Sequence, residues 1–155
     1  MEEIRIVNLA DAPELMEEVS RWLWQEWAKA DGYTLDEIIY RTKYASQRDT
    51  VPQMLVAVRE GQPVGVVSLW LNDLKTRQDL SPWMATLYVK EECRNLHIGQ
   101  RLQVASIEAV RALRRYEHLY LITKLNGYYE RIGWKFVEEA PAGGGAYERI
   151  YRYDL

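Results

Sequence analysis

The chain has 155 residues, 48% of them hydrophobic, which is enough for one domain with a buried core and too few for two ordinary domains. Its 20 Lys and Arg residues against 23 Asp and Glu give a net charge of −3, which excludes the basic excess of nucleic-acid-binding domains and favours a neutral or cationic small substrate. A single cysteine, Cys93, excludes an internal disulfide, and with only His97 and His118 beside it we expect neither a metal site nor redox chemistry.

The first third of the chain predicts one strand and two helices. Residues 4–7 fit a short strand, and no basic region or bilayer-length apolar run accompanies them, so we expect a cytoplasmic protein without membrane contact. Asp11, Pro13 and Glu14 have the pattern of a helix start, which predicts a helix that runs to the stop signal at residues 31–32. Thr34 and Glu37 form a second capping pattern, and the helix they begin extends to about residue 45.

The remaining two thirds predict strands that surround one long helix. Residues 54–58 and 64–70 are rich in β-branched side chains and are joined by a short polar stretch, which predicts a hairpin, and residues 83–89 predict another strand after a polar loop. The longest helix is predicted by an apolar stripe made of Ile98, Leu102, Ala105, Ala109, Leu113 and Tyr116. A strand at residues 118–123, a short helix at 126–132, a strand at 134–138, a glycine turn at 143–145 and a last strand at about 146–153 complete the chain.

This order of elements predicts an α+β fold of one domain over residues 1–155. A hairpin followed by strand, helix, strand, helix and strand gives a mixed, mostly antiparallel central sheet with helices on both faces, in three α/β/α layers. The junction between the strand at residues 83–89 and the long helix is where we expect a ligand.

The first candidate motif is the turn at residues 94–100, which opens the long helix. First-turn amides have no acceptor within a helix and carry the positive end of its dipole, so they suit a diphosphate. Arg94 adds a positive charge, and Gly99 leaves the backbone bare where a phosphate must come close. The competing interpretation is a turn with a purely structural role.

The second candidate motif is the segment at residues 127–136, which places Tyr129 on a short helix after the next strand. In a parallel arrangement this helix begins at the same end of the sheet as the Arg94 turn, so the two motifs converge. The competing interpretation is a tyrosine that only packs in the core.

Together the two segments resemble the GNAT superfamily of N-acetyltransferases over nearly the whole chain. The family pattern Q/R-x-x-G-x-G/A is similar to residues 94–99, and the pattern Y-E-x-x-G-W/F is similar to residues 129–134. His97 stands where the family usually has its first glycine. If the contact there is through a main-chain amide, a side chain that points to solvent is tolerable; if the turn needs a positive φ, the affinity for the coenzyme suffers.

The resemblance implies an acetyl-CoA-dependent N-acetyltransferase in which an amine attacks the thioester directly. Main-chain groups of the strand would hold the pantetheine arm and the turn would hold the diphosphate. The residues implied in coenzyme binding are Leu87, Tyr88, Val89, Arg94, Asn95, Leu96, His97, Ile98, Gly99, Gln100 and Asn126. Tyr129 would act as general acid on the departing thiolate. The acceptor would be a small-molecule or peptide amine, and the protein a monomer or homodimer.

The acceptor half is less well defined by the sequence. The amine needs a base, for which Glu26, Asp73 and Asp79 are candidates, although each is also explained as a solvated surface acid. The acceptor pocket would be lined by Trp24, Trp27 and Tyr33. Because His97 departs from the motif and no base is obvious, the alternative function is a non-catalytic acyl-CoA sensor or interaction module of the same fold.

Overall fold

The computed structural model describes residues 3–155, and its seven strands form one sheet in the order β1-β2-β3-β4-β5-β7-β6. The strands are β1 (Ile4–Asn8), β2 (Gln53–Arg59), β3 (Gln62–Trp70), β4 (Trp83–Val89), β5 (His118–Thr123), β6 (Lys135–Gly143) and β7 (Ala146–Asp154). Every neighbouring pair is antiparallel except β4 and β5, which are parallel. The predicted mixed, mostly antiparallel sheet is confirmed.

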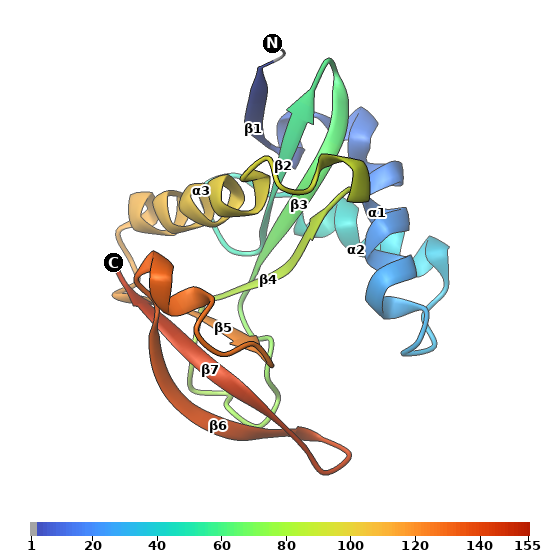
Figure 1. Ribbon diagram of the computed structural model, residues 1–155. Helices are drawn as coiled ribbons and strands as arrows, with labels where there is room; N and C mark the ends of the chain where they lie inside the picture. The colour runs from blue at the N-terminus through green and yellow to red at the C-terminus, as the bar shows by residue number, and fades with distance from the viewer. Residues whose placement is uncertain (1–2) are drawn as a thin grey trace.

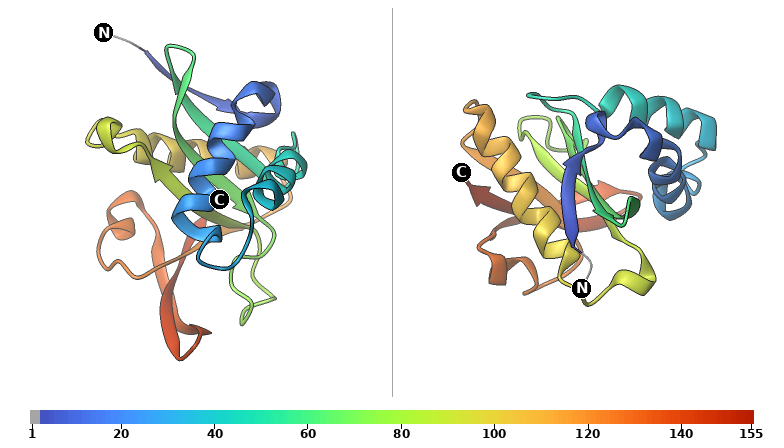
Figure 2. Two further views of the ribbon diagram at one scale, coloured as in Figure 1. Left: turned by 90° about the vertical axis from the view of Figure 1, so that its right-hand side faces the viewer. Right: turned by 90° about the horizontal axis from the view of Figure 1, so that it is seen from above.

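Helices cover both faces of this sheet. The α-helices are α1 (Met16–Leu23), α2 (Leu35–Ala45) and α3 (Ile98–Leu113). The shorter helical segments are η1 (Leu9–Asp11), η2 (Pro13–Leu15), η3 (Trp24–Ala28), η4 (Glu91–Cys93) and η5 (Tyr129–Ile132), of which η3 is π-helical. Figure 1 and Figure 2 show α3 on one face and α1 with α2 on the other. Among residues 3–155, none of the helices combines the length and the apolar character needed to cross a bilayer.

The hairpin of β2 and β3 lies between two apolar layers. Ala57 and Val67 pack toward α3, whereas Val56 and Val66 pack toward α1 and α2, because successive side chains of a strand point to opposite faces. All four side chains are fully buried, and burying each of the three valines contributes about 1.5–3 kcal/mol. Both faces of the sheet are covered here, which explains why apolar residues follow one another along these two strands.

The prediction for the start of the first helix was wrong. Asp11 caps nothing; its carboxylate accepts a hydrogen bond of 2.6 Å from Arg48 Nε, and α1 begins only at Met16, without a side-chain cap. The second predicted cap is confirmed, since the Thr34 hydroxyl accepts from the Glu37 amide at 3.1 Å and the Glu37 carboxylate accepts from the Thr34 amide at 3.0 Å. The local pattern assigned Asp11 to a helix cap, but Arg48, which is distant in sequence, binds its carboxylate instead.

Three later boundaries also differ from those predicted. α3 ends at Leu113, because Arg114 takes a left-handed conformation. The short helix after β5 begins only at Tyr129, and Gly133, with φ 109°, ends it as predicted. β6 extends to Gly143, which pairs with Ala146, so the turn is reduced to two glycines.

Candidate active site

Strands β4 and β5 diverge and leave a gap at the middle of the sheet. They are paired at one register position, Trp83 with Tyr120, so the main-chain groups of β4 beyond Trp83 that face β5 have no strand partner in the described part of the chain. Figure 1 shows β4 leaving β5 and leading through η4 to the start of α3. Main-chain N–H and C=O groups at the centre of a sheet are normally used in strand pairing. In this gap they are free to form hydrogen bonds with a ligand.

A bulge distorts β4 inside this gap. The β3–β4 register changes from Ser68 with Ala85 to Val66 with Tyr88, so β4 holds one extra residue there. Thr86 has φ 49°, and its hydroxyl is 2.5 Å from that of Ser68. A threonine in the left-handed region is strained, and such strain typically marks a functional site.

The turn before α3 presents free main-chain amides at the N-terminal end of this 16-residue helix. Among residues 3–155, no protein oxygen accepts a hydrogen bond from the main-chain amides of residues 95–100. Asn95 and His97 both have positive φ, 68° and 60°. The Arg94 guanidinium is held over the end of β4 by a 3.1 Å hydrogen bond from Nε to the Val89 carbonyl. These groups border a cavity of about 400 Å³, which suits a diphosphate.

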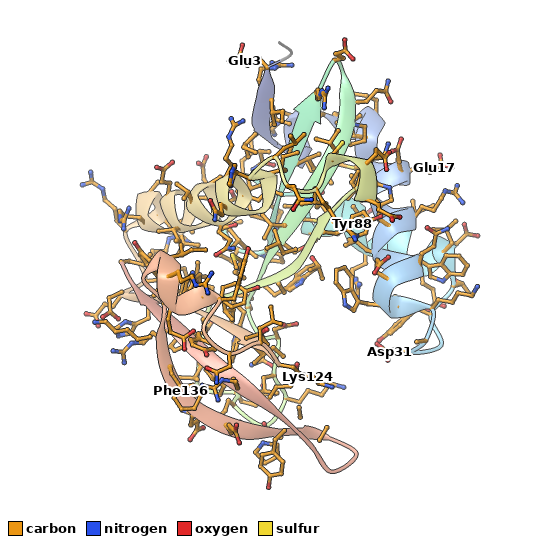
Figure 3. All side chains as sticks on the ribbon, viewed as in Figure 1. Glu3, Glu17, Asp31, Tyr88, Lys124 and Phe136 are labelled. Atoms are coloured by element: carbon orange, nitrogen blue, oxygen red, sulfur yellow. The ribbon has the colours of Figure 1, made fainter. Side chains whose placement is uncertain are left out.

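A second cavity, of about 470 Å³, lies beside the bulge and is called the acceptor cavity below. Its wall includes Thr86 and Leu87 of β4 and the rings of Trp27, Tyr33, Trp70 and Tyr129. Its charged side chains are Asp31, Arg41, Asp73 and Glu148. Figure 3 shows Asp31 at the end of the helical arm that carries α1 and η3. The cavity thus combines the bulged strand, two phenols and three carboxylates.

The two cavities are connected along β4 and η5. Leu87 borders the acceptor cavity and Val89 the diphosphate cavity, and two strand residues span about 7 Å. On the opposite side Tyr129 borders the acceptor cavity and Tyr128 the diphosphate cavity, with their ring centroids 4.8 Å apart. An extended ligand that follows β4 therefore passes from one cavity into the other.

Tyr129 is half-buried in an aromatic cluster. Its ring centroid lies 6.3 Å from that of Trp134 and 6.1 Å from that of Tyr151. Burial, reinforced by the neighbouring Tyr128, raises the pKa of Tyr129 to about 12. Its hydroxyl is therefore protonated throughout the neutral range and is a hydrogen-bond donor.

Asp73 lies on the loop after β3 and faces the same cavity. Burial, followed by the nearby Glu148 carboxylate, raises the pKa of Asp73 to about 7. No side chain among the described residues forms an ion pair with it. A carboxylate with this pKa is a far stronger base at neutral pH than an ordinary aspartate.

The other predicted acceptor residues are placed differently. Trp27 and Tyr33 border the acceptor cavity, whereas Trp24 packs below α1 and donates a 2.7 Å hydrogen bond to the Tyr33 carbonyl. Glu26 is exposed on η3, outside both cavities. Asp79 is exposed and accepts two 2.9 Å hydrogen bonds from Arg77, which lower its pKa. Neither acid lies beside Tyr129.

The predicted coenzyme residues also separate. Residues 94–95 and 97–100 border the diphosphate cavity together with Val89, while Leu96 and Asn126 are exposed and are not among the residues that border it. Leu87 borders the acceptor cavity. The Tyr88 side chain points to the other face of the sheet, where its ring lies 5.3 Å from that of Trp22, so only its main chain is available to the gap.

Sequence reasoning missed Glu148, Arg41 and Thr86. Glu148 lies in an alternating strand and Arg41 on an exposed helix face, and both reach the cavity only through the tertiary fold. No local signal indicates the bulge at Thr86. The pattern at residues 94–99 was the clearest signal in the sequence, and it concerns the coenzyme half alone.

Comparison with known proteins identifies the family. Residues 51–136 match the acetyltransferase (GNAT) domain. The chain belongs to the GNAT acetyltransferase family. Over 109 residues it is 27% identical to an uncharacterized N-acetyltransferase of Chlorobaculum tepidum, a match that covers 70% of this chain and 66% of that protein. The family uses acetyl-CoA as its acetyl donor.

Solved structures confirm the fold of this GNAT protein. An aminoglycoside 6'-N-acetyltransferase crystallised with coenzyme A superposes with a TM-score of 0.73 at 18% identity, over 97% of this chain and 96% of that one. A GNAT acetyltransferase from Streptococcus pneumoniae superposes with a TM-score of 0.71 at 16% identity, over 99% of both chains. The free amides at residues 95–100, the Arg94 charge and the unpaired edge of β4 fit acetyl-CoA.

Proposed function

We propose that this GNAT protein is an N-acetyltransferase that transfers the acetyl group of acetyl-CoA to a primary amine by direct attack. The observation that carries the proposal is one cavity in which Tyr129, Asp73 and the bulge of β4 meet, connected along β4 to the amides of residues 95–100. These are a proton donor, a proton acceptor and unpaired main-chain groups, which are the parts that acyl transfer to an amine requires.

Bound acetyl-CoA supplies an acetyl group activated as a thioester. The amides of residues 95–100 and the Arg94 guanidinium hold its diphosphate through charge-assisted hydrogen bonds. The unpaired edge of β4 at residues 87–89 holds the pantetheine arm. The positive φ at His97 gives the turn its shape in spite of a side chain that disfavours it.

Asp73 takes the proton that the attacking amine must lose. An alkylammonium group has a pKa of about 10.4, so transfer to an ordinary aspartate is uphill by about 9 kcal/mol. With the pKa of Asp73 at about 7 the same transfer is uphill by about 5 kcal/mol. Burial beside Glu148 thus makes Asp73 a usable base.

The bulge of β4 and Tyr129 stabilise the charges that develop in the reaction. A main-chain amide near Thr86 that is not used in the sheet donates to the carbonyl oxygen as it becomes negative. The Tyr129 hydroxyl donates to the departing sulfur. Full proton transfer from a pKa of about 12 to a thiolate whose thiol has a pKa of about 8.5 is uphill by about 5 kcal/mol, so the hydrogen bond itself is the main contribution.

The charge of the acceptor cavity favours a cationic amine. Asp31, Asp73 and Glu148 outnumber the one basic group, Arg41. The negative field raises the local concentration of ammonium groups before one of them loses its proton.

Release of free thiol from acetyl-CoA over a panel of amines tests the proposal. Amine-dependent release is expected, and it should fall at least tenfold in Asp73→Asn. The strained His97 favours the alternative, a coenzyme sensor with weak binding. If the protein binds the coenzyme but releases no thiol with any amine in the panel, the result would support the sensor and reject the enzyme.

A further inference from the structure

A further cavity on the surface of α2 adjoins the acceptor cavity. This third cavity, of about 440 Å³, shares Tyr33 and Arg41 with the acceptor cavity. The other side chains that border this cavity are Asp36, Glu37, Ile38 and Tyr40, all from the first two turns of α2. It is called the α2 subsite below, and a ligand in the acceptor cavity can extend into it past Tyr33.

Two exposed phenol rings form the apolar walls of the α2 subsite. Tyr33 is 46% exposed and Tyr40 is 68% exposed. The Tyr40 ring contacts that of Tyr44, with the centroids 5.1 Å apart, and Trp24 donates a hydrogen bond to the main-chain carbonyl of Tyr33. Large aromatic side chains that are exposed beside a cavity are typical of a binding surface.

Carboxylates give the α2 subsite a negative charge. Asp36 lies four residues before Tyr40, so both side chains emerge on the same face of α2. No basic side chain of the described residues forms an ion pair with Asp36. Glu37 is anchored by its hydrogen bond to the Thr34 amide, which lowers its pKa and keeps it ionised at neutral pH.

Arg41 does not neutralise these acids. Its guanidinium lies 5.8 Å from the ring centroid of Tyr33 and 5.7 Å from that of Trp70, between the two cavities. It forms no ion pair with an acid in the described part of the chain. The residues that border the two cavities include five acids, Asp31, Asp36, Glu37, Asp73 and Glu148, and one basic residue, Arg41. The combined site therefore favours a ligand with more than one positive charge.

We propose that the acceptor is an elongated amine with at least two ammonium groups, such as a linear polyamine, and that the α2 subsite binds the ammonium that is not acetylated. One amine lies beside Asp73, and a second is held by the Asp36 charge and by the faces of Tyr33 and Tyr40 through cation–π contacts. This inference rests on the proposed N-acetyltransferase activity and adds the class of acceptor to it.

Steady-state kinetics of two variants against two amines test the subsite. Tyr40→Ala and Asp36→Asn are each expected to raise KM for a linear tetraamine about fivefold to tenfold and to leave kcat within about twofold, because the subsite binds but does not react. Both should leave the kinetics of butylamine, which has one ammonium, unchanged. Tyr44→Ala is the matched control, since it removes the same Tyr40–Tyr44 ring contact without bordering the α2 subsite.

Calorimetric titration of the tetraamine into the coenzyme-free protein separates the subsite from the enzyme activity. We expect binding in the wild type that weakens at least fivefold in Tyr40→Ala and not in Tyr44→Ala. Equal KM values for the tetraamine in wild type and both subsite variants, with butylamine turned over normally, would overturn the subsite and leave the proposed function intact. Absence of thiol release with every amine would reject the proposed function, and the titration would still decide the subsite.

An acceptor with a carboxylate that binds Arg41 is the alternative occupant. In that case the wild type would prefer an amino acid to the tetraamine, and Arg41→Gln would abolish turnover of that amino acid. This pair of results would contradict the inference. A polyamine acceptor instead predicts that Arg41→Gln retains or lowers KM for the tetraamine, because it removes the one opposing charge.

Discussion

Replacing Asp73 with Asn is expected to stabilise the fold and to slow acetyl transfer. The two effects have one cause, because the burial that disfavours the Asp73 carboxylate also makes it a stronger base. Asn has nearly the same shape and carries no charge at any pH, so the substitution removes the buried charge without opening a cavity.

The size of the stability effect follows from the change in pKa on folding. The pKa of Asp73 rises from 3.8 in the unfolded chain to about 7 in the folded protein. Between these values the folded state binds more protons than the unfolded state, so stability falls as pH rises through this window. The penalty is absent below pH 4 and complete above pH 7, where it reaches up to about 4 kcal/mol.

Denaturant unfolding at pH 5 and pH 8 measures this effect. The gain in unfolding free energy of Asp73→Asn over wild type should be larger at pH 8 than at pH 5. Asp79→Asn is the control on the same loop: the pKa of Asp79 is lowered by Arg77, so its charge supports the fold at neutral pH and its removal should give no gain. An equal gain for Asp73→Asn at both pH values would refute the raised pKa.

The activity of the same variant provides a second readout. In the wild type kcat/KM should rise with pH through an inflection near the Asp73 pKa of about 7, because only the ionised form accepts a proton. Asp73→Asn should lower kcat by about 100-fold and remove that inflection. A wild-type inflection that persists in the variant would assign the base to another group.

Three further substitutions test the coenzyme half and the core. Tyr129→Phe should lower kcat about 10- to 100-fold and leave the Kd for acetyl-CoA, measured by calorimetry, within about twofold; an unchanged kcat would remove Tyr129 from the mechanism. His97→Gly relieves a left-handed residue with φ 60° and should tighten acetyl-CoA binding about twofold to tenfold, whereas an unchanged Kd would show that the turn is not strained. Gln103 is fully buried, and its amide has no hydrogen-bond partner among residues 3–155, so Gln103→Leu should raise the unfolding free energy by about 1–3 kcal/mol. A lower melting temperature of the variant would contradict this.

The parts of the fold that the sequence predicted depend on local pattern. The apolar runs of β2 and β3, the stripe of α3 and the capping box at Thr34 each lie within one element, and each is confirmed. Asp11 is an exception, because its local pattern did not predict its interaction. Its spacing fits a cap, but Arg48, 37 residues away in sequence, binds the carboxylate instead.

Within the candidate site, the sequence indicated only the turn that we propose for the coenzyme. Its turn is continuous in sequence, so free amides, Arg94 and Gly99 could be recognised together. The acceptor cavity is assembled from η3, α2, β4, β5, η5 and β7, and no spacing connects Asp73 with Glu148. The pKa that distinguishes Asp73 from Glu26 and Asp79 arises from burial, which a local sequence pattern does not show.

A crystal structure of the protein with coenzyme A tests the central claim most directly, because it locates both ends of the coenzyme at once. The diphosphate should lie on the amides of residues 95–100, and the sulfur should lie in the acceptor cavity within hydrogen-bonding distance of the Tyr129 hydroxyl. A diphosphate bound away from the start of α3, or a sulfur that points out of the gap between β4 and β5, would contradict it.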